Sequence, residues 1–179
     1  MADPRLLTIS GSLRRGSYNR MLLREAVRAF GPAEVHEADL RLPLYDGDLE
    51  DASGVPEAVE RLAAQIREAD AVVISSPEYN KGISGVMKNA LDWVSRVPGM
   101  AFRGKPVAVM SANDGRTGGE TGQFMLLSCP VPHQADVVPG APLCVALAGD
   151  EFDAEGRLKS DRYRKALDKR MEALRGRLG

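Results

Sequence analysis

The sequence has little of several features that define large protein classes. Among its 179 residues are two cysteines and two histidines, and aromatic residues make up only 5%. No apolar run approaches the roughly 18 residues of a transmembrane helix, and the N-terminal segment lacks the apolar core of a secretory signal. The net charge of −1 is unlike the basic character of general nucleic-acid binders. We therefore expect no disulfide framework, no membrane or nucleic-acid partner, and a cytoplasmic location.

Short apolar runs alternate with amphipathic segments along the chain. Runs of strand length occupy residues 5–9, 35–40, 71–75, 107–110 and 143–147. Apolar residues recur at helical spacing in 23–30, 55–69, 83–94 and 163–178. This alternation predicts an α/β fold, a doubly wound five-stranded parallel sheet with helices on both faces. The length predicts a single domain spanning residues 1–179.

Three polar loops follow predicted strands. They span residues 10–19, 76–85 and 111–122. In a doubly wound sheet the ligand lies beyond the carboxyl ends of the strands, at the point where the strand order reverses. These loops are therefore the candidate binding elements.

The first loop has the composition of a phosphate site. It contains three serines before Asn19, together with Arg14 and Arg15, and a predicted helix follows it. Hydroxyls, guanidinium groups and the N-terminus of a helix all bind anions. A capped turn would also need a serine, but this loop has more donors than a cap requires. The dinucleotide fingerprint G-x-G-x-x-G is absent, so the pattern is not that of a Rossmann domain.

The second loop, Ser76–Gly82, leaves two interpretations open. Its proline, tyrosine and glycine could wrap the edge of a flat ring, or the loop could be structural with Tyr79 on the surface. Other chemistry has little support, because His36 and His133 lack partners at metal-ligand spacing. Cys129 is interpreted as a small core residue. We predict no metal site and no catalytic side chain.

Three segments together resemble the NADPH-dependent FMN reductases, which include chromate, quinone and some azo reductases. They are Gly11–Asn19, Pro77–Asn80 and Gly85–Arg96, supported by Gly104–Pro106 and Gly118-Gly119. The resemblance extends from about residue 5 to residue 120 and is specific in order and spacing. It implies a flavodoxin-like FMN-binding domain with strand order 2-1-3-4-5 and FMN at the strand ends.

The resemblance also implies a set of cofactor-binding residues. The FMN phosphate would lie against the first loop, the ring against the second, and a serine after the fourth strand would close the site. These residues are Ser12, Leu13, Arg14, Ser17, Tyr18, Asn19, Pro77, Glu78, Tyr79, Asn80 and Ser111.

The activity implied is an NAD(P)H oxidoreductase with bound FMN. NADPH or NADH would be the cosubstrate, and a quinone, an azo compound or a metal oxyanion would be the small-molecule acceptor. The family resemblance also implies a homodimer or homotetramer. The alternatives are a flavodoxin-type electron carrier, which the near-neutral charge disfavours, and a flavin-binding redox sensor without NAD(P)H turnover.

One segment departs from the family pattern. The family continues a long helix after the position of Gly122, whereas here Pro130 and Pro132 follow closely. A helix does not readily continue through two prolines. We therefore expect a short or absent helix in this region, which in the family contributes to oligomer contacts and to the wall of the acceptor pocket.

Overall fold

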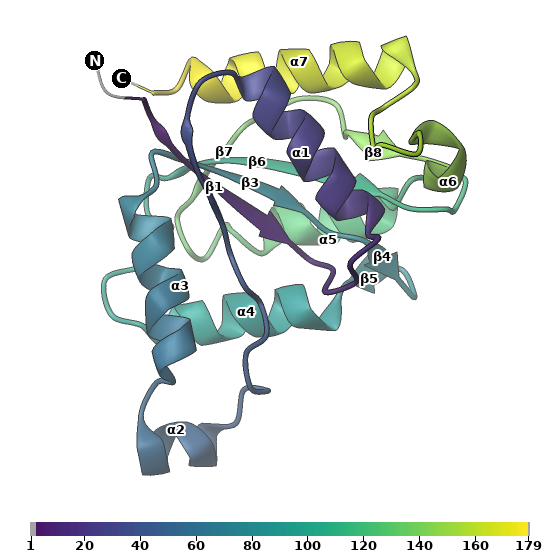
Figure 1. Ribbon diagram of the computed structural model, residues 1–179. Coiled ribbons are helices and arrows are strands. Elements are labelled where there is room, and N and C mark those ends of the chain that lie inside the picture. Colours follow the sequence, from purple (N-terminus) through teal and green to yellow (C-terminus); the bar gives the residue numbers. More distant parts are fainter. Residues whose placement is uncertain (1–2, 179) are drawn as a thin grey trace.

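A parallel β-sheet forms the centre of the computed structural model, which describes residues 3–178 (Figure 1). Its strands are β1 (Arg5–Ser10), β2 (Glu34–Glu37), β3 (Ala71–Ser75), β6 (Pro106–Ala112), β7 (Asp136–Val137) and β8 (Cys144–Val145). They are ordered β2-β1-β3-β6-β7, and β8 pairs with the far end of β6. With β7 and β8 taken as two parts of a fifth strand, the predicted order 2-1-3-4-5 is confirmed.

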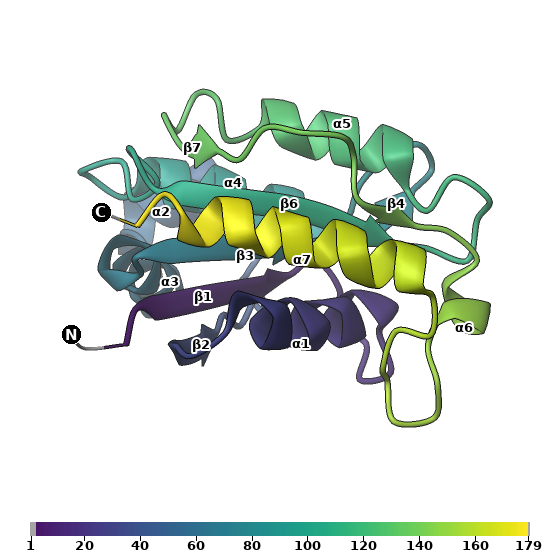
Figure 2. The same ribbon diagram turned by 90° about the horizontal axis from the view of Figure 1, so that it is seen from above.

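Helices cover both faces of the sheet, as predicted. On one face α1 (Tyr18–Phe30) and α7 (Asp161–Arg175) lie side by side (Figure 2). On the other face are α3 (Glu57–Glu68), α4 (Gly85–Arg96) and α5 (Glu120–Ser128). Two short helices, α2 (Gly47–Ser53) and α6 (Ala148–Glu151), lie outside these layers. No helix among residues 3–178 is both long enough and apolar enough to cross a membrane.

The core consists of two apolar clusters separated by the sheet. In β3, Val72 and Ile74 join the cluster with α3 and α4, whereas Val73 joins the cluster with α1 and α7. All five residues of β3 are buried, because strands on both sides and helices on both faces enclose it. The continuous apolar sequence Ala71–Ser75 is the consequence of this double coverage.

The strands at the edge of the sheet differ from the predictions. The run predicted at 35–40 forms β2 at Glu34–Glu37, and all four of its residues are exposed. The run predicted at 143–147 is a strand only at Cys144–Val145. The chain between β7 and β8 contains Pro139 and Pro142, which have no N–H to donate to a ladder, so the fifth strand is interrupted there.

A helix does form before the two prolines. It is α5, which begins after Gly119 and ends at Ser128, two residues before Pro130. The helix stops before the prolines, as expected, but α5 itself was not among the helices predicted from the apolar pattern. A hairpin of β4 (Glu78–Tyr79) and β5 (Gly82–Ile83), which the sequence did not predict, lies next to α5.

Candidate functional site

A cleft of about 330 Å³ opens at the carboxyl ends of β1, β3 and β6. The chain passes from β1 to β2 on one side, whereas β3 lies on the other side of β1, so the cleft is at the switch point of the sheet. Its lining residues are Ser12, Arg14, Ser17, Tyr18, Asn19, Pro77, Tyr79, Ala112, Asn113, Asp114 and Gly115.

The β1–α1 loop offers free backbone donors beside this cleft. Ser10 Oγ accepts from the N–H of Ser12 at 3.2 Å, and Ser17 Oγ caps α1 by accepting from the N–H of Asn19 at 3.2 Å. Between them, the N–H groups of residues 13–17 donate to no acceptor within residues 3–178. Successive free N–H groups before the N-terminus of a helix bind anions, and the exposed Arg14 adds a positive charge.

The tight path of this loop depends on Gly11. A Cβ at this position would lie 2.3 Å from the Oγ and 3.0 Å from the Cα of Ser76. The N–H of Gly11 donates to the carbonyl of Ser75 at 2.8 Å, which extends the β1–β3 pairing by one residue. The first loop is thereby placed directly beside the segment that follows β3.

Asn19 connects the first loop to the ends of two other strands. Its side chain is 3% exposed. Its Oδ1 accepts from Ser75 Oγ at 2.8 Å and from the N–H of Ala112 at 3.0 Å, and its Nδ2 donates to the carbonyl of Ala112 at 2.9 Å. The Asn19 amide thus makes the two hydrogen bonds to the backbone of β6 that a neighbouring strand would make, at a position beyond the end of β3. Asn19 is a positioning residue for the cleft.

The second loop is a hairpin held from two sides. Its turn residues, Asn80 and Lys81, have positive φ values of 49° and 67°, as in the type I′ turns that join paired strands. The carboxylate of Glu78 accepts from the N–H of Gly122 at 2.8 Å and lies 3.6 Å from Lys81 Nζ. Glu78 therefore anchors the hairpin to α5, while Tyr79, which is 61% exposed, lines the cleft.

Asn113, which follows β6, holds the other side of the hairpin. Its Oδ1 accepts from the N–H of Glu78 at 3.1 Å, and its Nδ2 donates to the carbonyl of Glu78 at 2.9 Å. This paired contact fixes the distance between the second and third loops. Nearby, the buried Ser111 donates to the carbonyl of Gly118 at 2.7 Å and closes the third loop on itself.

The far wall of the cleft comes from Asp114 and Tyr18. Asp114 Oδ1 accepts from the N–H of Gly149 at 2.9 Å, and the Tyr18 ring stacks on Phe152 with 5.9 Å between centroids. Both contacts attach the cleft to the segment around α6. The wall therefore depends on residues far along the chain from the binding loops.

Seven of the eleven predicted cofactor-binding residues line the cleft. The other four lie beside it: Leu13 packs on the core, Glu78 faces α5, Asn80 forms the hairpin turn, and Ser111 is buried. The prediction omitted Ala112, Asn113, Asp114 and Gly115. They lie in the loop 111–122, which its position after a strand had marked as a candidate binding element, but which the resemblance represented by Ser111 alone.

Neither cysteine is activated as a nucleophile. Burial raises the pKa of the Cys144 thiol, and Cys144 Sγ donates to Gln123 Oε1 at 2.6 Å behind the cleft. Burial also raises the pKa of the half-buried Cys129 thiol. Among residues 3–178 there is no group of three or more His, Cys, Asp or Glu side chains placed to hold a metal ion.

The fold and the cleft define an α/β protein with a polar cleft at the switch point of its sheet. The sequence profile of the NADPH-dependent FMN reductases matches residues 4–148, and the chain belongs to this family.

Individual relatives agree with this assignment. The chain is 41% identical over 174 residues to an NAD(P)H-dependent FMN reductase of Pseudomonas aeruginosa, covering 96% of this chain and 94% of the relative. It is 43% identical over 125 residues to a quinone reductase of Escherichia coli K12, covering 68% and 66%. Among solved structures, the flavoenzyme NAD(P)H:(acceptor) oxidoreductase FerB of Paracoccus denitrificans superimposes with a TM-score of 0.84 at 28% identity, covering 98% and 97%.

Proposed function

We propose that the protein is an FMN-dependent NAD(P)H oxidoreductase that reduces a quinone-type acceptor. Family membership and the relatives support this activity. The observation that carries it is the row of free N–H groups at residues 13–17, which adjoins a cleft walled by the β4–β5 hairpin. An anion site joined to a site for a flat group matches the phosphate and the isoalloxazine ring of FMN.

The residues present fit FMN. The phosphate would accept from the N–H groups of residues 13–17, including that of Leu13, and from the Ser12 hydroxyl, with Arg14 compensating its charge. The ring would lie between the hairpin and the backbone of residues 112–115. In this proposal Glu78, Asn80 and Ser111 act by fixing the loops rather than through direct side-chain contact.

Bound FMN supplies the two-electron chemistry that connects NAD(P)H to the acceptor. The chain itself supplies binding and orientation. Asn113 fixes the hairpin against the third loop, and Tyr79 stands at the exposed mouth of the cleft. We assign no side chain as a proton donor or acceptor. Azo compounds and metal oxyanions are further candidate acceptors, and either NADPH or NADH could be the cosubstrate.

We further propose that residues 1–179 act as one FMN-binding domain in a cytoplasmic homodimer or homotetramer. Exposed apolar side chains on and after α5 support contact with a second copy: Phe124 is 56%, Met125 46% and Val131 68% exposed. Met125 also contacts the hairpin, since its Sδ lies 3.5 Å from where a Cβ of Gly82 would be. A second copy packed on these side chains would therefore lie near the hairpin that walls the cleft.

The test is an absorbance spectrum of the purified protein, followed by NADPH and then a quinone in the absence of oxygen. The expected result is bound FMN whose colour is lost with NADPH and returns with the quinone. FMN that is bleached by dithionite but not by NADPH or NADH would indicate an electron carrier or a redox sensor instead. Failure to bind FMN, even when FMN is supplied, would refute the assignment of the phosphate site.

A further inference from the structure

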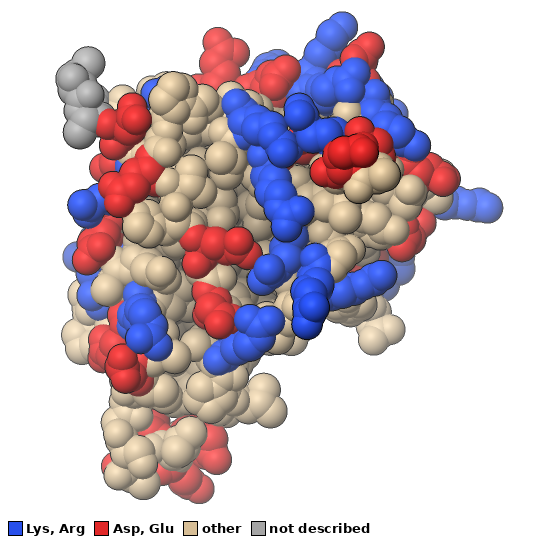
Figure 3. All heavy atoms as spheres, in the orientation of Figure 1, with Lys and Arg blue, Asp and Glu red and all other residues tan. Residues whose placement is uncertain are grey.

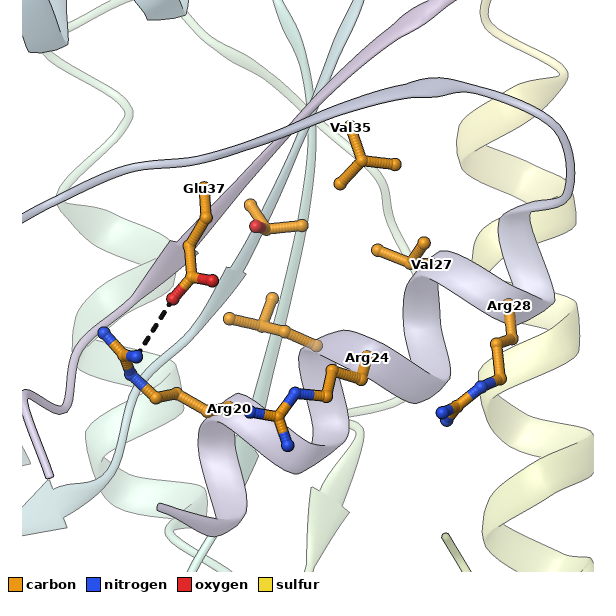
Figure 4. Close-up of a pocket in the computed structure, with 8 residues that line it drawn as sticks. Arg20, Arg24, Val27, Arg28, Val35 and Glu37 are labelled. Atoms are coloured by element: carbon orange, nitrogen blue, oxygen red, sulfur yellow. Dashed lines mark ion pairs between the residues drawn. The ribbon is translucent and has the colours of Figure 1, made fainter. Parts of the chain in front are cut away.

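A second concave site lies between α1 and the edge strand β2 (Figure 4). It encloses about 390 Å³ and shares no residue with the cleft at the strand ends. Volumes of this order are typical of sites for small molecules. The lining residues are Thr8, Arg20, Leu23, Arg24, Val27, Arg28, Val35 and Glu37.

The floor of this groove is largely apolar. Leu23 and Val27 come from α1, and Val35 comes from β2. Val35 is 42% exposed although it lies in a strand, because α1 does not cover the outer edge of the sheet. An organic ligand placed here would remove apolar surface from water, which favours binding.

One wall of the groove is a row of arginines. Arg20, Arg24 and Arg28 are four residues apart, so they lie along one side of α1, and Figure 3 shows a band of basic side chains along this helix. Like charges at this spacing repel one another and destabilise a helix. The row therefore has an unfavourable electrostatic energy unless anions compensate it.

Carboxylates of the protein compensate only the ends of the row. Arg20 lies 3.2 Å from Glu37 Oε1, and Arg28 pairs with the buried Glu25. The central Arg24 is exposed and has no carboxylate within 4 Å among residues 3–178. The positive charge that remains is thus at the middle of the groove, directly beside its apolar floor.

We propose that this groove binds a small organic anion, a compact apolar body with one carboxylate or phosphate group. The body would lie on Val27 and Val35, and the anionic group would accept from Arg24, the arginine of the row that no carboxylate of residues 3–178 pairs with. A concave site with one well-exposed large apolar residue, Val35, suits a single small molecule better than an anionic membrane surface.

The test uses 1-naphthyl phosphate as the probe and protein with excess FMN, so that the strand-end cleft is filled. Methyl resonances of Val27 and Val35 are followed by NMR during the titration. The expected result is saturable binding that shifts both methyl signals, with much weaker shifts from neutral 1-naphthol. Arg24→Glu is expected to weaken binding by about ten- to a hundredfold, the effect of losing a charge-assisted contact. Val27→Asp, which puts a negative charge on the floor, is expected to abolish it.

The matched control is Arg61→Glu, because Arg61 is also an exposed helical arginine but lies on α3, outside the groove. Its affinity for the probe should equal that of the unaltered protein. The proposal is overturned if the probe does not saturate, if it shifts other residues but not Val27 and Val35, or if Arg24→Glu binds equally well. Binding to vesicles of phosphatidylglycerol without binding of the probe would also overturn it, in favour of a membrane surface.

Discussion

Replacement of Asn19 by alanine tests whether the cleft is held open by a side-chain network. The substitution removes three hydrogen bonds of 2.8 to 3.0 Å and leaves the N–H and carbonyl of Ala112 without their partners. A net hydrogen bond contributes about 0.5–1.5 kcal/mol, and a buried polar group left unsatisfied costs about 1–3 kcal/mol. Because Asn19 also borders the cleft, water can satisfy part of this loss. We expect Asn19→Ala to lower the free energy of unfolding by about 2–4 kcal/mol.

The assay is urea unfolding followed by circular dichroism, with FMN affinity measured on the same samples. A loss of this size corresponds to a fall in Tm of roughly 4–16 °C for a chain of this length. FMN affinity should fall as well, because Asn19 positions the first loop against the ends of β3 and β6.

Asn89 provides a matched control. Its amide also makes two contacts with the backbone of a distant loop, accepting from the N–H of Tyr45 at 2.8 Å and donating to the carbonyl of Pro43 at 2.9 Å. Both contacts are exposed, so water can replace them, and Asn89→Ala should cost less than about 1 kcal/mol. Equal losses for the two variants, or a loss below about 0.5 kcal/mol for Asn19→Ala, would refute the argument from burial.

Two further predictions concern the third loop and the pH dependence of stability. Gly118 has a φ of +64°, and a Cβ there would lie 2.7 Å from the carbonyl carbon of Cys144. Gly118→Ala should therefore destabilise the fold and weaken FMN binding, whereas Gly85→Ala should do neither, because the space around Gly85 is open. Thermal unfolding with and without FMN measures both effects. Burial lowers the pKa of His133, whose ring packs edge-on against Phe102, so the unfolded chain protonates this group more readily than the folded one. The resulting loss of stability develops as pH falls below about 6.5. The urea midpoint of His133→Gln should therefore change less between pH 7 and pH 5 than that of the unaltered protein. An equal or larger change would contradict the assignment of this pH dependence to His133.

The sequence was sufficient to predict the central strands and the main helices, because burial imposes a regular apolar pattern on them. The five apolar residues of 71–75 and the stripe of α4 are direct consequences of coverage by neighbouring elements. The edge of the sheet was less predictable, since β2 is fully exposed and carries no such pattern. The β4–β5 hairpin was not predicted either, because neither turn residue with positive φ is a glycine, and because Glu78 holds the hairpin through contacts with residues distant in sequence, Asn113 and Gly122.

The difference between local sequence patterns and contacts distant in sequence applies to the candidate site as well. The resemblance and the loop composition located the first two loops, but they could not reveal which polar groups the fold itself uses. The amides of Asn19 and Asn113 are engaged with backbone groups, and the carboxylate of Glu78 is engaged with the N–H of Gly122. These contacts form only when segments about 35 to 93 residues apart are brought together, so no local pattern encodes them.

The use of these side chains within the fold determines how the cleft can bind a ligand. No buried side-chain nitrogen or oxygen among residues 3–178 is without a hydrogen-bond partner. The free donors of the loop backbone are the N–H groups of residues 13–17, whose positions depend on Gly11, Ser10 and Asn19 rather than on the identity of the loop side chains. We therefore expect substitutions of exposed loop residues such as Arg15 to change FMN affinity less than substitutions of Gly11, Ser10 or Asn19, although these three residues are buried.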